Sequence, residues 1–436
     1  MQNVTSKPSA PIPSERKNYF FPLVLVTSLF FFWGFVHNLD PVLIPHLRKA
    51  FQLTDLESSL VDFSIFIAYF LMAIPAGIIM RKYGYKSGII LGLCLFALGA
   101  LLFIPAANTR MYIFFLGALF IIACGLTFLE TAANPYVTIL GPSETATRRL
   151  NFSQSFNGLA AFIAPIIGGK YILNEQSFTD AQIKALSTQD LEMYITQESA
   201  SVKGPYLILG IIIIVVMLSF VFTRLPDIKH EDDGHTSTIS NVWKHKHLRW
   251  AVVAQFFYVG AQVCVLSFFI RFIVVSAGIT EKNAAFYSGL AGLAFMVGRF
   301  AGTFFMKFMK PNKLLMIYAV LSLLLTLVAI FGAGNITIYA LIGVAFFMSI
   351  MFPTIFSLGI SGLGKDTKIA SSLIVMSIVG GAVLPLGLGY ISDLTQNIQY
   401  GYIVPLICFV VVFAFGMSGW KPVDESSENI QKNHEK

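Results

Sequence analysis

Two carboxylic acids stand in stretches of this sequence that are otherwise almost wholly apolar. Asp40 occurs in "FFFWGFVHNLDPVLIPHL" (30–47), and Glu130 occurs in "GLTFLETAANPYVTILGP" (125–142). A charged side chain at the centre of a lipid bilayer costs about 2.5–3.5 kcal/mol on insertion scales, so acids in such places usually face a cavity and carry function. We therefore expect both acids to face a cavity inside a membrane protein.

Amide side chains recur near Glu130 at the spacing of a helix face. One stripe lies in the same segment and comprises Thr127, Glu130, Thr131 and Asn134. A second stripe lies in "RRLNFSQSFNGLAA" (148–161) and comprises Asn151, Gln154 and Asn157. A third lies in "AQFFYVGAQVCVLSFFIRF" (254–272) and comprises Gln255, Tyr258 and Gln262. Residues three or four apart share one face of a helix, so the first two stripes predict a polar cleft.

Amides, hydroxyls and flanking rings suit a neutral polyhydroxylated ligand such as a sugar. Amides donate and accept hydrogen bonds to hydroxyl groups, and aromatic rings cover C–H faces. The alternative for each single amide is an interhelical hydrogen bond, worth about 0.6 kcal/mol on average. Two arginines also lie in apolar segments. We expect Arg271 to reach the membrane surface and Arg299 to hold helices together, while His37 either tunes Asp40 or packs.

The composition indicates the elements that must position these residues. Of 436 residues, 56% are hydrophobic and 12% are charged, whereas about a quarter are charged in water-soluble domains. Twelve apolar segments recur along the chain, each of roughly 20 residues, the length that spans a hydrocarbon core about 30 Å thick. Frequent Gly and Pro favour helices over a β-barrel. We predict an all-α integral membrane protein with twelve transmembrane helices.

A polar stretch, "RLPDIKHEDDGHTSTISNVWKHKHLRW" (224–250), divides the twelve segments six and six. The predicted organisation is a cytoplasmic N-terminal tail (1–19), a first six-helix half (20–224), a cytoplasmic linker (225–247), a second six-helix half (248–420) and a cytoplasmic C-terminal tail (421–436). Most of the 30 Lys and Arg then fall in cytoplasmic loops, as the positive-inside rule requires. The net charge of +7 therefore reflects topology and predicts no nucleic-acid partner.

Several other classes of protein are excluded by the sequence. The N-terminus is polar and proline-rich, which predicts a tail and not a signal peptide. The four cysteines lie in apolar segments without CxxC spacing, so neither a metal site nor a disulfide is expected. "GISGLGKDT" (359–367) lacks the Ser or Thr that a phosphate-binding loop needs after its lysine. No HExxH or GxSxG pattern occurs, so we predict no enzyme.

The two halves resemble each other locally. "AGIIMRKYGYK" (76–86) follows the second segment and "AGTFFMKFMKPNK" (301–313) follows the eighth, and each places a glycine, Gly77 or Gly302, one helical turn before a basic cluster. A repeated six-helix unit is typical of major facilitator transporters, whose halves rock about a substrate site at the membrane midplane. The loop is similar to that superfamily's signature, with Arg81 where an aspartate is usual.

More specifically, the chain resembles the fucose-proton symporter family of this superfamily, which also includes glucose/galactose permeases. The strings that carry the resemblance are "LETAANPYVTILGP" (129–142), "RLNFSQSFNG" (149–158), "AQFFYVGAQV" (254–263) and "FPTIFSLGI" (352–360), and it extends over about residues 20–420. The resemblance implies a twelve-helix symporter that brings L-fucose or a similar hexose inward with a proton. It further implies that Glu130 carries the proton and that Gln154 and Asn157 lie near the sugar.

The sequence departs from the family pattern at two places. The family's first-helix motif reads Asn-Leu-Asn-Asp, whereas Asn38 here begins Asn-Leu-Asp-Pro, so Asp40 comes one position early, about 100° away around the helix. Either Pro41 distorts the helix and returns Asp40 to the cavity, or Glu130 carries the coupling alone. Phe352 stands where the fucose symporter has a tyrosine, which removes one hydroxyl.

The predicted function is secondary active sugar transport by alternating access in the bacterial inner membrane. We expect Glu130 and Asp40 to couple transport to the proton. The expected substrate-binding residues are Asn38, Asn134, Gln154, Asn157, Tyr258 and Gln262. The expected partners are a hexose and the lipid bilayer, with a functional monomer and no cofactor or metal besides the co-transported proton. The alternatives are a sodium-coupled glucose/galactose symporter and, from another class, a sugar sensor that does not transport.

Overall fold

The computed structural model describes residues 20–39, 43, 47, 51, 55–172, 186–225 and 238–421, and every regular element within these ranges is a helix. The first group comprises α1 (Phe20–His37), α3 (Asp55–Thr109), α4 (Tyr112–Ile139), η1 (Ser143–Thr145), α5 (Ala146–Tyr171), α7 (Thr188–Ser201) and α8 (Lys203–Phe222). The second group comprises α9 (Ile239–Val242), α10 (Lys246–Ser267), α11 (Phe269–Ala277), α12 (Glu281–Phe305), α13 (Pro311–Phe331), α14 (Asn335–Met348), α15 (Met351–Gly359), η2 (Gly364–Asp366), α16 (Thr367–Met376), η3 (Ser377–Val379), α17 (Gly380–Thr395), α18 (Ile398–Gly401), α19 (Ile403–Ala414) and the π-helical η4 (Phe415–Gly419).

Ten helical stretches of the described residues are long and apolar enough to cross a membrane. One of them, Leu60–Thr109 of α3, holds two crossings, because Gly84 breaks the helix with φ 85° and ψ 169°. The ten leave out α5, whose 26 residues extend about 39 Å and so also span a core of about 30 Å. Polar residues, including Arg148 and Arg149, lower its mean hydropathy. Counting α3 twice and adding α5 gives the twelve predicted spans.

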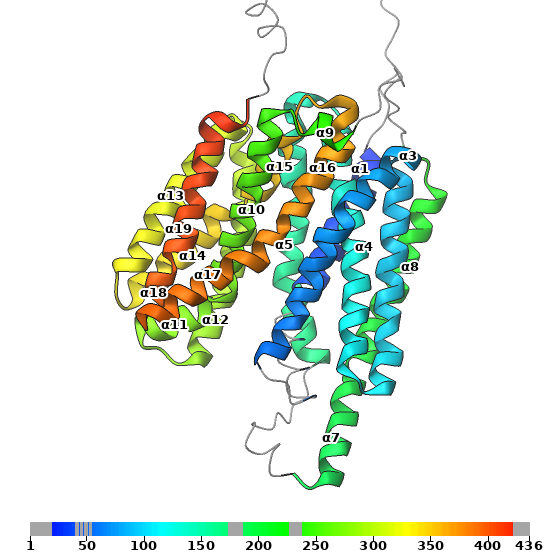
Figure 1. The fold of residues 1–436 in the computed structure, drawn as a ribbon, viewed down its shortest axis with the longest axis vertical. Helices are drawn as coiled ribbons and strands as arrows, with labels where there is room; N and C mark the ends of the chain where they lie inside the picture. The colour runs from blue at the N-terminus through cyan, green and yellow to red at the C-terminus, as the bar shows by residue number, and fades with distance from the viewer. Residues whose placement is uncertain are drawn as a thin grey trace, which may run out of the picture.

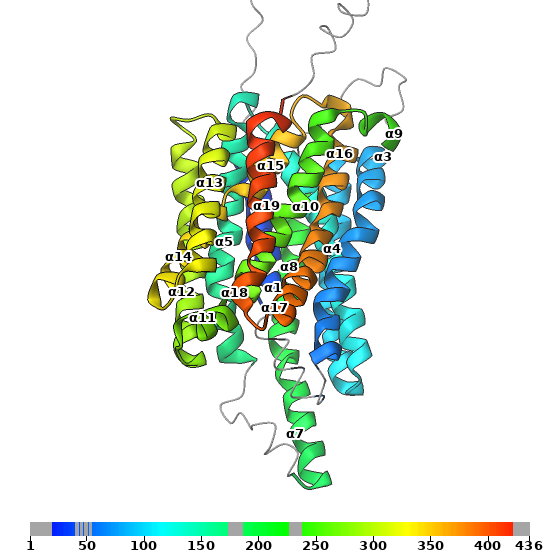
Figure 2. The same cartoon turned by 60° about the vertical axis from the view of Figure 1, so that its left-hand side comes forward.

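The helices form two bundles that lie side by side, the first group in one and the second group in the other (Figure 1). At one end of the molecule lie α9 and the beginning of α1, and α7 projects beyond the opposite end, as a view turned by 60° also shows (Figure 2). We call the first of these ends, which holds Phe20, Gly84, Ala146 and α9, the terminal face. Lys86 links α3 to α8 at this face, because its Nζ donates a hydrogen bond to the main-chain oxygen of Val221 at 2.8 Å.

The two halves contact each other near the terminal face. There α5 packs on α12 and α15, and α16 packs on α3 and α4. The hydroxyls of Thr147 and Ser357 are 2.9 Å apart, and Nδ2 of Asn151 donates to Oγ1 of Thr354 at 3.2 Å. Both pairs involve the first two turns of α5, so the halves are closed together at this face.

The repeated glycines that the sequence singled out are both sites of close helix contact. A Cβ on Gly77 would collide with the side chain of Ser372 of α16, in the other half. A Cβ on Gly302 would collide with Ile350, just before α15, in the same half. Small residues let membrane helices approach closely. The repeat therefore serves packing in both halves, but only the Gly77 contact joins one half to the other.

The second span of α3 and the middle of α4 also approach closely, at a pair of glycines. A Cβ on Gly125 would lie 2.5 Å from the main-chain oxygen of Gly92 and 2.6 Å from the nitrogen of Phe96. These are backbone atoms of a packed helix, which cannot turn aside as the end of a flexible side chain can. Gly117 lies in the same helix α4, and a Cβ there would have no atom within 4 Å.

Gly125→Ala should therefore destabilise the fold by about 1–3 kcal/mol, the usual cost of overpacking, although alanine is the better helix former. Gly117→Ala is the matched control and should leave the unfolding temperature unchanged or slightly raised. Thermal unfolding of the two variants in detergent, followed by tryptophan fluorescence, measures the difference. Equal unfolding temperatures would contradict the close contact between the two helices.

Candidate functional site

Glu130 is buried in the middle of α4, with only one of its carboxylate oxygens bonded. The hydroxyl of Tyr69, on α3, donates to Oε1 at 2.9 Å. Nε2 of His37, on α1, lies 3.0 Å from the same hydroxyl, and since the tyrosine proton goes to Glu130, Nε2 is the donor in this arrangement. Oε2 of Glu130 is buried and has no hydrogen-bond partner among the described residues. Side chains from α1 and α3 therefore form a chain of hydrogen bonds that ends at the carboxyl group on α4.

A second series of hydrogen bonds leads from Glu130 to the other half of the molecule. Nδ2 of Asn134 donates to the main-chain oxygen of Glu130 at 2.9 Å. On α5, Nε2 of Gln154 donates to Oδ1 of Asn134 at 3.0 Å. On α12, Nη1 of Arg299 donates to the main-chain oxygen of Gln154 at 2.5 Å and to its Oε1 at 3.3 Å. The series thus links α4 and α5 of the first half to α12 of the second.

Arg299 is a buried cation at the boundary between the halves, with only 3% of its surface exposed. Its Nε donates to the main-chain oxygen of Ser349 at 3.0 Å, and its guanidinium carbon lies 4.6 Å from the centre of the Phe295 ring. Glu130 and Tyr258 are near enough to interact with it electrostatically. These contacts agree with the expectation that Arg299 holds neighbouring helices together.

Asn157 and Asn38 lie where α1 meets α5. A Cβ on Gly34 would come within 2.8 Å of Cγ and Nδ2 of Asn157, so the missing side chain of Gly34 makes room for this amide. Oδ1 of Asn157 is 3.5 Å from Nη1 of Arg299, a long contact. Nδ2 of Asn38 donates to the main-chain oxygen of Gly34 at 2.7 Å. Both amides remain partly exposed, so water or a ligand can reach them.

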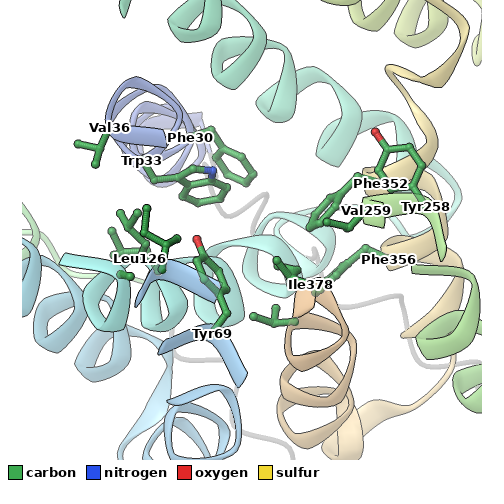
Figure 3. Close-up of a cluster of buried hydrophobic side chains, with 14 of the residues drawn as sticks. Phe30, Trp33, Val36, Tyr69, Leu126, Tyr258, Val259, Phe352, Phe356 and Ile378 are labelled. Atoms are coloured by element: carbon green, nitrogen blue, oxygen red, sulfur yellow. The ribbon is translucent and has the colours of Figure 1, made fainter. Parts of the chain in front are cut away.

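The second half contributes aromatic rings and an accessible amide. Tyr258 is fully buried on α10, and its ring centre lies 6.4 Å from that of Phe352 on α15. Figure 3 shows these two rings on one side of the close-up and Trp33 and Tyr69 of the first half on the other. One turn beyond Tyr258, Gln262 is partly exposed. Aromatic rings from both halves therefore belong to one buried cluster.

Several members of the predicted stripes have other partners. Thr127 and Thr131 donate to the carbonyl oxygens four residues earlier in α4, at 2.8 and 2.7 Å. Asn151 belongs to the contact with Thr354 between the halves. Gln255 is fully buried, and neither of its amide atoms has a partner among the described residues. A shared helix face thus fixes the direction of these side chains but not what they bind.

The second predicted acid, Asp40, lies outside the described residues, as do Pro41 and His46. Arg271 is exposed on α11, which agrees with the expectation that it reaches the membrane surface. Tyr69 was not predicted, because a tyrosine within "SIFIAYFLMAI" (64–74) is more often a core residue. Within the described ranges, no three His, Cys, Asp or Glu side chains are grouped as a metal ion would require.

Comparison with known sequences agrees with the family resemblance that the sequence motifs indicate. The family model of the Major Facilitator Superfamily matches residues 24–368. The L-fucose-proton symporter of Escherichia coli (strain K12) is 41% identical over 409 residues, which cover 92% of this chain and 93% of that protein. A glucose/galactose transporter of Brucella abortus is 38% identical over 420 residues, which cover 96% of this chain and 98% of that protein.

Comparison with solved structures identifies the same family as the sequence comparison. The crystal structure of the major facilitator superfamily transporter FucP in the outward conformation matches with a TM-score of 0.86 and 41% identity, over 92% of this chain and 99% of that one. The predicted fold of twelve helices in two halves is thereby confirmed, and so is the prediction that the chain is no enzyme, since these relatives are transporters. The chain belongs to the major facilitator superfamily and, within it, to the family of L-fucose-proton symporters and glucose/galactose transporters.

Proposed function

We propose that this protein imports L-fucose or a related hexose together with a proton, by alternating access of its two halves. The observation that carries the proposal is the series of hydrogen bonds from Glu130 through Asn134 and Gln154 to Arg299. The series begins at the main-chain oxygen of Glu130, so it places two amides and a guanidinium beside the residue that carries the protonatable carboxyl group. The names of the relatives, L-fucose-proton symporter and glucose/galactose transporter, support a hexose as the substrate.

Glu130 is the proposed proton carrier. Only Oε1 accepts from Tyr69, so the unpartnered Oε2 can take up a proton, or accept from a ligand hydroxyl, without breaking that bond. The hydrogen bonds at Tyr69 and His37 offer a route for the proton across α3 and α1. Asp40, which follows at the end of α1, stays in the proposal as the second coupling residue on the strength of the sequence.

The proposed sugar contacts are Asn38, Asn134, Gln154, Asn157, Tyr258 and Gln262. Three of these amides, on Asn38, Asn157 and Gln262, are partly exposed and can bind hydroxyl groups directly. Asn134 and Gln154 are bonded to each other, so they hold the carboxyl side of the site in shape and bind sugar through their remaining donor and acceptor positions. Aromatic rings beside them offer faces for the C–H groups of a sugar.

Arg299 connects ligand binding to the movement of the halves. Its bonds to Gln154 cross from α12 to α5, and a sugar hydroxyl that bonds the Gln154 amide competes with one of them. A proton on the Glu130 carboxyl group removes its negative charge and so weakens its electrostatic attraction to the Arg299 guanidinium. We propose that sugar and proton together shift the equilibrium between the two conformations and that neither suffices alone.

The terminal face is proposed to lie in the cytoplasm of a bacterial inner membrane. Lys82, Lys86, Arg148, Lys307 and Lys310 all lie at this end, and positive charge gathers on the cytoplasmic side of membrane proteins. In this orientation the contact between the halves closes the cytoplasmic side, and α7 lies outside the cell. All proposed contacts come from one chain, so a monomer suffices for transport.

Uptake by proteoliposomes under imposed ion gradients tests the proposed function. Labelled L-fucose, D-glucose and D-galactose are offered separately, each with a proton gradient, a sodium gradient or neither. At least one hexose should accumulate above its external concentration with the proton gradient alone. Accumulation that requires sodium would replace the proton with sodium as the coupling ion, and no accumulation of any sugar would contradict the proposal.

Glu130→Gln should abolish uphill uptake driven by a pH gradient and preserve counterflow exchange of the sugar. Glutamine keeps an oxygen that can accept from Tyr69, but it cannot release a proton. Initial rates of uptake and of exchange in proteoliposomes measure the two effects. Glu192→Gln, at an exposed carboxylate on α7, is the matched control. Undiminished uphill uptake by the Glu130 variant would remove its coupling role.

Tyr69→Phe should lower the rate of proton-driven uptake by at least about tenfold, the lower limit for one hydrogen bond to a charged group, with sugar affinity preserved. The change removes the hydroxyl that joins His37 to Glu130 and leaves the ring in place. Uptake rates and sugar titrations by calorimetry separate the two quantities. Tyr83→Phe, at an exposed ring, is the control. A loss of sugar affinity with an unchanged rate would instead place Tyr69 in the sugar site.

Asn157→Ala should weaken sugar binding about threefold to tenfold, the loss expected for one hydrogen bond between neutral groups. Equilibrium binding of the transported hexose to purified protein measures this change. Asn335→Ala, at an exposed position at the start of α14, should bind the sugar as the unmodified protein does. Equal affinities for the two variants would exclude Asn157 from the substrate site.

A further inference from the structure

Two adjoining cavities lie between helices near the terminal face. The first has a volume of about 470 Å³ and is bounded by α1, α5 and α12, with the basic residues Arg148, Arg149 and Lys307 in its wall. The second has a volume of about 520 Å³ and is bounded by α1 and α5, almost entirely by apolar atoms. Leu23 and Phe152 line both cavities, so a basic pocket continues into an apolar groove.

The basic pocket contains positive charge that no acidic side chain of the described residues neutralises by an ion pair. Arg149 is occupied, because it donates to main-chain oxygens in the last turn of α4 and to that of Pro142 in the connection to α5, and it interacts electrostatically with Glu144. Arg148 has neither a hydrogen bond nor an ion pair within the described residues. Nζ of Lys307 rests 5.3 Å from the centre of the Phe304 ring. Two cations on opposite walls, Arg148 and Lys307, are thus free to bind an anion.

The apolar groove suits a hydrocarbon chain. Its wall on α1 extends from Phe20 to Phe32, about 18 Å along a helix axis, which is close to the depth of one leaflet in a core about 30 Å thick. Two hydroxyls lie in this wall, and both are already bonded: Thr27 to Ser153 at 2.8 Å, and Ser28 to the main-chain oxygen of Leu25 at 2.7 Å. The groove therefore offers a ligand apolar contact alone.

We propose that an anionic phospholipid of the leaflet at the terminal face binds here, with its phosphate between Arg148 and Lys307 and one acyl chain in the groove along α1. Basic pockets between membrane helices recognise anionic headgroups, and the rings of Phe300 and Phe304 cover the region where the headgroup joins its chains. Arg148 belongs to α5 and Lys307 follows α12, so the lipid contacts both halves of the transporter. The site is independent of the proposed sugar and coupling ion.

Lipid titration of the full chain in detergent, read by native mass spectrometry, tests the site. Phosphatidylglycerol with two oleoyl chains should bind more tightly than phosphatidylcholine with the same chains. The double variant Arg148→Gln/Lys307→Gln should lose about 25-fold in affinity for phosphatidylglycerol, about fivefold for each charge removed. Lys310→Gln/Lys313→Gln removes two exposed basic residues of the same face that do not line the pocket and should bind phosphatidylglycerol within about twofold of the unmodified protein.

Further variants separate the headgroup from the chain and guard against misfolding. Arg148→Lys keeps the charge and should retain binding, whereas Val24→Trp fills the groove and should weaken phosphatidylglycerol binding with all charges intact. Millimolar inorganic phosphate should not displace the lipid. Equal phosphatidylglycerol affinity in the double variant and its control would overturn the proposal. So would displacement by inorganic phosphate combined with an unaffected Val24→Trp variant, because the pocket would then be a site for a free anion.

Discussion

A polar group inside a bilayer has no water to bond, so its partner must come from the protein itself. Asn134, Gln154 and Arg299 meet this requirement by bonding one another and the main-chain oxygen of Glu130, while Tyr69 bonds one oxygen of the Glu130 carboxyl group. The first two links lie within the first half, and the bonds from Arg299 to Gln154 cross the boundary between the halves. The atoms that hold the halves together are therefore the same kind of donors and acceptors that a sugar and a proton would engage. The same amide and guanidinium groups therefore hold the halves together and are available to bind ligands.

The fold could be predicted in advance because each span must be apolar and about 20 residues long. The two least regular spans show what hydropathy leaves out. Only the non-helical turn at Gly84 separates the two spans of α3, and α5 carries several polar groups, including Arg148 and Arg149, within its length. This span is among the twelve apolar segments of the sequence, and the spacing of Asn151, Gln154 and Asn157 then predicted a polar face on it.

The site could be predicted only in part, because helical spacing gives a direction and not a partner. Gln154 and Asn134 lie on predicted faces and do meet, whereas Asn151, on the same face as Gln154, bonds across to Thr354. Tyr69 comes from a helix with no polar stripe, so its bond to Glu130 depends on how α3 packs against α4. Such packing depends on the shapes of side chains, which a pattern of polar residues does not record.

The polar character of α5 has a further consequence for how the protein is made. A segment with several amides and two arginines partitions weakly from the translocon into lipid on its own. Its early partners, α1 and α4, precede it in the chain and already lie in the membrane when it leaves the ribosome. Arg299 is synthesised about 145 residues after Gln154. Until α12 is complete, the first half must therefore keep the weakly hydrophobic helix α5 in the membrane while Gln154 lacks its cationic partner.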